Sequence, residues 1–265
     1  MHAIAFHLGS RPIYWYGICV ALGFLAATGY WTWRTRRDGL GPDFAGDMAF
    51  WLMLAGVLGA RLFYVLAEWP YFRAHPEAIV RIDQGGLVFY GGFLGAAVAA
   101  WVVARQRQVA LLDLGDLILS GLPLGHAFGR IGCFLNGCCY GGPTHTCIGV
   151  HYPTQSPPWL DYGTQGLWPT QLIEAGWNLA LFIGLALWYP RRRYRGVLSG
   201  AYLALYGLQR FGNEFLRGDE RPDWHGLSQA QWLSLALILA GLALIVARRW
   251  HGLPAHTSRA EGNNR

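Results

Sequence analysis

The stretch from His126 to Gly142, HAFGRIGCFLNGCCYGG, places one histidine, one arginine and three cysteines among small and apolar residues. Cysteine sulfur and histidine nitrogen are metal ligands, two cysteines can form a disulfide, and arginine binds a phosphate through two parallel hydrogen bonds. The residue types therefore permit a metal centre, a disulfide or a phosphate-binding elbow. The elements around the stretch decide between these possibilities.

Further ionisable residues interrupt apolar stretches elsewhere in the chain: Arg61, Glu174, Arg210 and Glu214. On a helix, Arg210 and Glu214 share a face because they are four residues apart. Gln171 lies three residues before Glu174 and shares its face in the same way. A structural ion pair would explain Arg210 and Glu214 without any function. However, Arg61, Arg130 and Arg210 are three arginines in apolar stretches that contain only two carboxylates, Glu174 and Glu214. This predicts an excess of positive charge, which favours a bound anion such as a lipid phosphate.

The composition indicates an integral membrane protein. The chain of 265 residues is 53% hydrophobic and only 14% charged, whereas a soluble domain carries about 25% charged residues. Its mean hydropathy is +0.24. The formal net charge of +6 comes from arginines in short clusters between apolar stretches, which is typical of membrane topology signals and excludes a nucleic-acid partner.

Apolar windows of about 20 residues predict seven membrane-spanning helices and thus an all-α integral membrane protein. The predicted spans are Ile13–Trp33, Met48–Leu66, Leu87–Ala104, Leu117–Leu135, Leu172–Tyr189, Val197–Phe215 and Leu227–Ala247. Arginine clusters follow the first, third, fifth and seventh spans, which places the N-terminus outside and the C-terminus in the cytoplasm. We expect one membrane domain over residues 1–253, an outer-face (periplasmic) loop or head region over about 138–170, and a disordered cytoplasmic tail over 254–265.

The cysteines of the outer region follow the spacing C-x4-CC-x7-C: Cys133, Cys138, Cys139 and Cys147. This spacing matches no paired C-x2-C zinc site, and an outer-face compartment is oxidising. Disulfides or free thiols fit the pattern best, and we therefore expect no metal and no cofactor. Zinc held together with a nearby histidine (His126, His145 or His151) and a catalytic thiol remain alternatives.

Six motifs along the chain are similar to those of one known family. They are YWYG at Tyr14–Gly17, GARLFYVL at Gly59–Leu66, GGLVFYGGFLG at Gly85–Gly95, GRIGCFLNG at Gly129–Gly137, PTQLIEA at Pro169–Ala175 and YGLQRFGNEFLR at Tyr206–Arg217. In order and spacing the chain resembles the prolipoprotein diacylglyceryl transferases, enzymes of the bacterial inner membrane. The resemblance implies transfer of a diacylglyceryl group from phosphatidylglycerol to the lipobox cysteine of a prolipoprotein signal peptide, with release of glycerol phosphate.

The resemblance also implies roles for individual residues. Arg130 and Arg210 would hold the phosphate, and Glu214 would orient Arg210. Tyr16 would line the headgroup pocket, and Gly141 would keep the turn after the signature open. Tyr90 occupies the position of a catalytic histidine of the family. The remaining residues expected on the phospholipid side are Arg61, Asn136, Gly91, Gly92, Gln171 and Glu174.

Three signature positions differ from the family. Its His-Gly-Gly is here Tyr90 followed by two glycines, its Asn after Arg-hydrophobic-Gly is Cys133, and the acidic residue five positions later is Cys138. A tyrosine hydroxyl is a poor base at neutral pH, which leaves His126 or Glu214 as alternative bases. The differences keep other hypotheses open: transfer from the same donor to another acceptor, lipid binding without turnover, and an envelope thiol or metal protein.

Overall fold

The structure is a computed structural model that describes residues 3–82, 85–218, 223–251 and 254. Within these residues, helices of 18 or more residues number seven. They are α1 (Trp15–Arg37), α2 (Phe44–Ala67), α4 (Phe89–Gln106), α5 (Leu111–Asn136), α7 (Thr170–Trp188), α8 (Val197–Glu214) and α9 (Gln229–His251). Each overlaps one of the seven spans expected from the sequence, so the prediction of a helical protein is confirmed.

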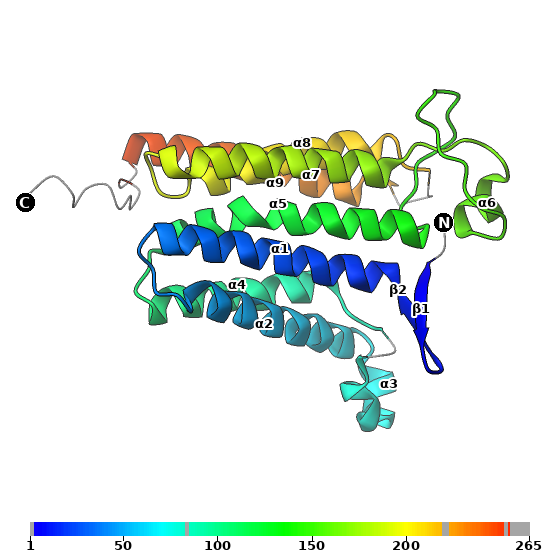
Figure 1. Cartoon of the computed structure of the whole chain (residues 1–265), viewed down its shortest axis with the longest axis horizontal. Helices are drawn as coiled ribbons and strands as arrows, with labels where there is room; N and C mark the ends of the chain where they lie inside the picture. Colours follow the sequence, from blue (N-terminus) through cyan, green and yellow to red (C-terminus); the bar gives the residue numbers. More distant parts are fainter. Residues whose placement is uncertain (1–2, 83–84, 219–222, 252–253, 255–265) are drawn as a thin grey trace, which may run out of the picture. The chain divides into compact units, whose positions relative to one another are not determined.

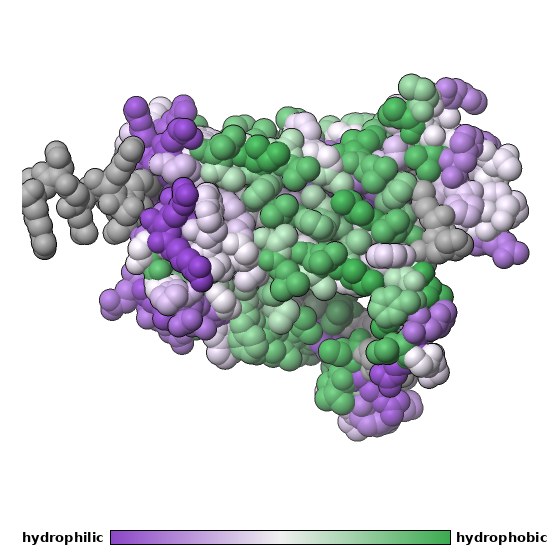
Figure 2. All heavy atoms as spheres, in the orientation of Figure 1, coloured by the Kyte–Doolittle hydropathy of each residue, from purple (hydrophilic) through white to green (hydrophobic). Residues whose placement is uncertain are grey.

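Four segments are long and apolar enough to cross a membrane: Phe44–Ala67, Leu111–Asn136, Thr170–Arg191 and Gln229–Trp250. On the face shown in Figure 2, hydrophobic side chains cover the middle of the long helices and hydrophilic ones gather near their ends. Large apolar side chains on these helices are exposed, for example Leu58, Leu187 and Leu239, at 60%, 62% and 67%. Such surfaces suit contact with lipid. The chain is therefore a helical membrane protein.

Short elements precede or connect the long helices (Figure 1). They are β1 (Ile4–Leu8), β2 (Arg11–Tyr14), α3 (Trp69–Ala74), η1 (Pro76–Val80), α6 (Pro157–Tyr162), η3 (Tyr189–Arg191), β3 (Asp223–Trp224) and β4 (Leu227–Ser228). The two antiparallel hairpins, β1 with β2 and β3 with β4, were not expected from the sequence. In the first hairpin Leu8 pairs with Arg11, and Gly9 at φ +64° supplies the tight turn between them.

The chain forms two compact units: residues 1–30 together with 116–265, and residues 31–115. In the smaller unit, α2 and α4 pack through glycines. A Cβ atom on Gly92 would lie 3.3 Å from the carbonyl oxygen of Gly56, and one on Gly59 would lie 3.1 Å from the Cα atom of Gly95. Close approach of helix backbones therefore explains these glycines.

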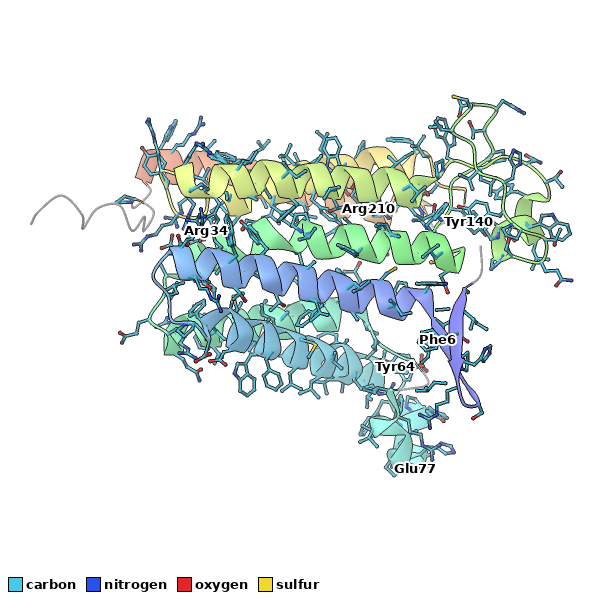
Figure 3. All side chains as sticks on the ribbon, viewed as in Figure 1. Phe6, Arg34, Tyr64, Glu77, Tyr140 and Arg210 are labelled. Atoms are coloured by element: carbon cyan, nitrogen blue, oxygen red, sulfur yellow. The ribbon has the colours of Figure 1, made fainter. Side chains whose placement is uncertain are left out.

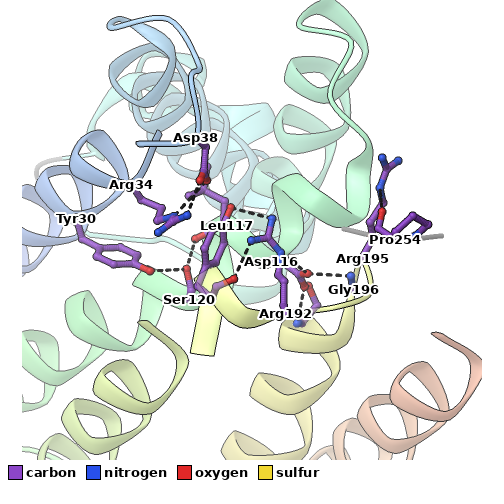
Figure 4. Close-up of polar contacts among 12 residues, drawn as sticks. Tyr30, Arg34, Asp38, Asp116, Leu117, Ser120, Arg192, Arg195, Gly196 and Pro254 are labelled. Atoms are coloured by element: carbon purple, nitrogen blue, oxygen red, sulfur yellow. Dashed lines mark hydrogen bonds and ion pairs between the residues drawn. The ribbon is translucent and has the colours of Figure 1, made fainter. Parts of the chain in front are cut away.

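In the larger unit, α8 packs against α9 through Gly200 and Gly207, which face backbone oxygens of α9. Where α8 begins, the buried carboxylate of Asp116 accepts hydrogen bonds from the backbone N–H groups of Gly196 and Ser199 at 2.9 and 2.8 Å (Figure 4). It also accepts the hydroxyl of Ser199 at 2.7 Å and pairs with Arg192. Asp116 thus satisfies the N-terminal donors of α8, which have no partner inside the helix.

The segment between α5 and α7 forms a head with its own small core of Tyr140, Tyr152 and Leu167. The segment covers the residues for which an outer-face head was expected, about 138–170, and its place outside the membrane stays a prediction. The expected tail begins at Pro254, which accepts a hydrogen bond from Arg195, and residues 255–265 lie outside the described part of the chain.

Candidate functional site

Helices α5, α7 and α8 bring four of the expected site residues together in the larger unit. Arg130 of α5 forms an ion pair with Glu174 of α7. Arg210 of α8, labelled among the long helices in Figure 3, lies 2.6 Å from Glu214 Oε2 and 3.9 Å from Glu174 Oε1. The Glu174 side chain is only 2% exposed. One buried carboxylate therefore lies between two arginines from different helices, and we call these four residues the arginine–glutamate cluster.

The ion pairs keep both guanidiniums in place without using all of their donors. Two guanidiniums carry ten N–H groups, whereas two carboxylates accept four of them when each binds in a bidentate manner. The formal charge of the cluster is zero, so the excess of positive charge expected from Arg61, Arg130 and Arg210 does not arise within it. Its capacity for an anion therefore rests on the spare donors of the two guanidiniums.

Arg61 has a different role from the one expected. Its five N–H donors all bond to backbone carbonyls, at 2.6 to 3.1 Å, within the unit formed by residues 31–115. The acceptors belong to Ala78, Ile79, Arg81, Gly85 and Gly86. A guanidinium has five N–H groups, so none remains for a phosphate. In this structure Arg61 fixes the segment between α3 and α4.

Three expected residues lie at the start of α4, in the same unit as Arg61. Tyr90 is half exposed, at 50%. A Cβ atom on Gly91 would clash with the side chain of Phe63, and Gly92 lies against Ala60 and Gly56 of α2. Helix packing therefore explains Gly91 and Gly92 without a ligand.

Buried amides around the arginine–glutamate cluster were missed by the sequence reasoning. Among the described residues, both polar side-chain atoms of Gln209 and of Asn213 are buried without a hydrogen-bond partner, and so is Asn178 Oδ1. Gln209 and Asn213 share the helix that carries Arg210, and Asn178 lies one turn after Glu174. Buried polar atoms without a protein partner bind water or a ligand. The sequence signal that could have revealed these residues is an amide side chain within an otherwise apolar helix.

Two further ring residues border the cluster. The ring of His126 lies 5.5 Å from that of Tyr206, and His126 also interacts with Asn178, Arg130 and Arg210. Tyr16, the second residue of α1, lies within electrostatic range of Arg130 and of the cysteines that follow it. The expectation that Tyr16 lines the site is consistent with this position.

The end of α5 explains how cysteines five residues apart meet. The N–H of Cys138 bonds to the carbonyl of Cys133 at 3.1 Å, and the N–H of Gly137 bonds to that of Phe134 at 3.2 Å. With Gly137 at φ +72°, these bonds form a Schellman motif, whose geometry brings the two outer residues into contact. Here both outer residues are cysteines.

The next residue, Cys139, completes a group of three thiols. Its φ of +64° lies in the left-handed region, which costs a non-glycine residue about 1–3 kcal/mol. The sulfurs of Cys133, Cys138 and Cys139 all lie within 4.8 Å of one another, and none of the five cysteines forms a disulfide. Hydrogen bonds from Cys133 and then Cys138 hold the pKa of the Cys139 thiol well below its usual range, with Arg217 adding to the effect.

Side chains of α7 hold the backbone of this thiol group. Thr170 donates to the carbonyl of Cys139 at 2.7 Å, and Gln171 donates to that of Cys138 at 2.8 Å. Both side chains are buried. Gln171, expected on the phospholipid side, therefore positions the cysteines. Asn136, the last residue of α5, also interacts with Cys138 through its side chain.

Gly141 lets three segments meet beyond the thiols. Its N–H bonds to the carbonyl of Trp168 at 3.0 Å, and the N–H of Gly142 bonds to that of Leu216 at 2.9 Å. A Cβ atom on Gly141 would lie 2.6 Å from the Leu216 oxygen. The need for glycine at this position thus comes from the junction of the head, the start of α7 and the end of α8.

Comparison with known proteins relates this arrangement to one family. A family model described as prolipoprotein diacylglyceryl transferase matches residues 3–247. The chain is 38% identical over 255 residues to the phosphatidylglycerol–prolipoprotein diacylglyceryl transferase of Cupriavidus necator, covering 92% of this chain and 91% of that protein. It is 34% identical over 233 residues to the second such transferase of Clostridium perfringens, with 88% and 90% coverage. Its identity to the Clostridium tetani transferase is 35% over 243 residues, with 91% and 96% coverage.

Proposed function

This chain belongs to the prolipoprotein diacylglyceryl transferase family, and we propose that it transfers a diacylglyceryl group from phosphatidylglycerol to the lipobox cysteine of a prolipoprotein signal peptide. Glycerol phosphate is the second product. The observation that carries the assignment of the site is the position of Glu174 between Arg130 and Arg210. Two guanidiniums held apart by a buried carboxylate can bind one phosphate from two sides.

The charge change of the reaction suits this arrangement. The acceptor sulfur forms a bond to a glycerol carbon of the lipid, and the bond from that carbon to the phosphate oxygen breaks. The donor phosphate is a diester with one negative charge, and it leaves as a monoester with more negative charge. Cations already in place therefore bind the transition state more strongly than the substrate, which is the requirement for catalysis. Arg130 and Arg210 are the residues in this role.

The other polar residues have supporting roles in the proposal. Glu214 accepts the hydroxyl of Ser228 at 2.8 Å while it pairs with Arg210, so it orients that arginine. This engagement makes Glu214 a poor candidate for the base. His126 lies near both guanidiniums and beside the ring of Tyr206, so it borders the proposed phosphate position. The buried amides of Gln209 and Asn213 can bind the hydroxyl groups of the lipid headgroup.

We also propose that all seven long helices span the bacterial inner membrane, with the N-terminus outside. The arginine clusters support this orientation, because they lie in the last turns of α1, α4 and α9 or just after the end of α7. The thiol group and the head of residues 138–170 then lie at the outer face, where an exported signal peptide presents its cysteine.

A direct assay tests the function. The purified protein, in micelles that contain phosphatidylglycerol, is incubated with a lipobox peptide, and the products are identified by mass spectrometry. We expect a peptide heavier by one diacylglyceryl group and an equal amount of glycerol phosphate. The Arg130→Ala and Arg210→Ala variants should lose turnover, and Arg11→Ala on an exposed strand should retain it.

The differences at Tyr90, Cys133 and Cys138 favour a second candidate function, transfer to a different acceptor. If the protein binds phosphatidylglycerol but leaves the lipobox peptide unmodified, the first assignment fails. The same assay with small envelope thiols in place of the peptide would then identify the acceptor.

A further inference from the structure

We propose that Cys133, Cys138 and Cys139 bind one divalent cation of the zinc class, and that the open fourth position of the ion takes the acceptor thiol. The second half of this proposal rests on the proposed function. The sequence reasoning expected no metal because the spacing matches no paired C-x2-C site. The Schellman motif at the end of α5 brings the cysteines together, although their spacing in the sequence does not suggest this.

The distances between the sulfurs suit such an ion. Tetrahedral zinc with bonds of about 2.3 Å to sulfur requires sulfurs about 3.8 Å apart. The three sulfurs lie within 4.8 Å of one another, so each pair needs to approach by about 1 Å or less to reach that spacing. All three side chains are partly exposed, which leaves a path for the ion.

The surrounding contacts hold the ligands in advance. Thr170 and Gln171, both buried, bond to the carbonyls of Cys139 and Cys138. The left-handed conformation of Cys139 turns two successive side chains toward the same centre. Outer contacts of this kind orient metal ligands in proteins, and their loss lowers metal affinity about 10- to 100-fold.

The charges also balance. Three thiolates and one divalent cation carry a net charge of −1. Arg217 interacts with Cys139. Arg130 lies one turn before Cys133 and interacts with Cys133 and with Cys139. Positive side chains at this distance stabilise thiolates and offset the remaining charge.

Only three protein ligands are present among the described residues, since the group contains no histidine or carboxylate. Structural zinc sites have four protein ligands, whereas catalytic sites have three and keep the fourth position for a reacting group. The group therefore has the composition of a catalytic site rather than of a structural one.

The proposed reaction needs such a group. The acceptor cysteine must attack as a thiolate, and the tyrosine hydroxyl at position 90 is a poor base at neutral pH. A thiol that binds a cation loses its proton, which passes to solvent. The bound sulfur then attacks the glycerol carbon, and the electron pair of the broken carbon–oxygen bond leaves with the glycerol phosphate. The neutral thioether dissociates from the ion, and no oxidant or reductant is consumed.

Cobalt titration of the full chain tests the site without relying on activity. The protein is purified in detergent under reducing conditions, stripped with a chelator and titrated with Co²⁺, whose absorption reports sulfur ligands. We expect one equivalent to give a sulfur-to-cobalt band, displaced by Zn²⁺. Each of Cys133→Ser, Cys138→Ser and Cys139→Ser should weaken the affinity about 10-fold or more. Cys19→Ser and Cys147→Ser are the matched controls and should leave it unchanged, since neither belongs to the group.

Two further measurements separate this inference from the proposed function. A lipobox peptide should change the cobalt spectrum toward four sulfur ligands, and the same peptide with serine for cysteine should not. Removal of the metal should abolish lipid transfer, and Zn²⁺ should restore it. Absence of the band, a band that survives all three serine substitutions, or a spectrum that ignores the peptide would overturn the inference. So would full transfer by metal-free protein, in which case the proposed function stands. Cobalt binding without any lipid transfer would instead reject the function and keep the metal site.

Discussion

Two clusters of charged residues lie in the same unit of this protein, and they differ in how completely the chain satisfies them. At the start of α8, the two carboxylate oxygens of Asp116 receive three hydrogen bonds from Gly196 and Ser199, and Arg192 pairs with them. In the arginine–glutamate cluster, Glu174 Oε1 is buried with no hydrogen-bond partner among the described residues, and its nearest Arg210 nitrogen lies 3.9 Å away. Buried polar groups are normally satisfied.

The difference separates structural charges from functional ones. A carboxylate that the fold already saturates cannot bind anything more without losing a bond. A cluster with spare donors and acceptors has a capacity that only water or a ligand can use. Residue type does not distinguish the two regions, since both consist of arginine and carboxylate side chains.

Loss of the saturated carboxylate should mainly reduce stability. We expect Asp116→Ala to lower the free energy of unfolding by about 3–5 kcal/mol, because it leaves the first N–H groups of α8 and Arg192 without their shared acceptor. Thermal unfolding in detergent measures the effect, and turnover per folded molecule should stay unchanged. Asp47→Ala, which removes an exposed ion pair with Arg107, is the control and should cost about 1 kcal/mol or less. Equal effects of the two substitutions would contradict this assignment of Asp116.

Loss of an arginine from the unsaturated cluster should mainly reduce turnover. We expect Arg210→Ala to lower kcat about 100- to 1,000-fold, the range observed when one preorganised donor to a developing anion is removed. The lipid-transfer assay, corrected for the folded fraction, measures it. Arg191→Ala serves as control, since this exposed arginine bonds to the carbonyl of Leu187. Turnover within about threefold of the unmodified protein would remove Arg210 from the site.

The membrane character and the long helices could be predicted from the sequence, because apolar windows and arginine clusters are local signals. The expected span Val197–Phe215 matches α8, which ends one residue earlier. The first hairpin was missed, although Gly9 and Ser10 formed the expected two-residue turn signal.

The roles of individual polar residues depended on contacts that sequence spacing does not reveal. Arg61 looked equivalent to Arg130 and Arg210, yet its carbonyl partners lie 17 to 25 residues further along the chain. The meeting of the three thiols was missed for a different reason. Gly137 after a helix predicts a Schellman motif, but the cysteines were compared only with zinc and disulfide patterns.

Arg61 is the sharpest test of the criterion, because its place in an apolar stretch groups it with the two arginines proposed to bind the phosphate. All its donors are used by backbone carbonyls, so we expect Arg61→Ala to reduce stability by about 1.5–3 kcal/mol, the value of hydrogen bonds to a charged group. The KM for phosphatidylglycerol should not change in the folded protein. Arg73→Ala on α3 provides an exposed arginine of the same unit for comparison. A raised KM with unchanged melting would return Arg61 to the lipid site.

The smallest effect is expected from two buried glutamines that differ in whether their side-chain amides have hydrogen-bond partners. Both amide atoms of Gln209 lack partners among the described residues, whereas Gln231 Oε1 accepts the N–H of Ser228 at 2.9 Å. Gln209→Leu removes an unsatisfied buried amide, so the free energy of unfolding should rise by about 1 kcal/mol. The KM for phosphatidylglycerol should rise about fivefold if this amide binds the headgroup, which is the loss of one neutral hydrogen bond. Gln231→Leu should lower stability instead, because it leaves the partly buried Ser228 N–H without its acceptor. Melting curves of the two variants that shift in the same direction would mean that the pattern of partners does not separate ligand-binding amides from structural ones.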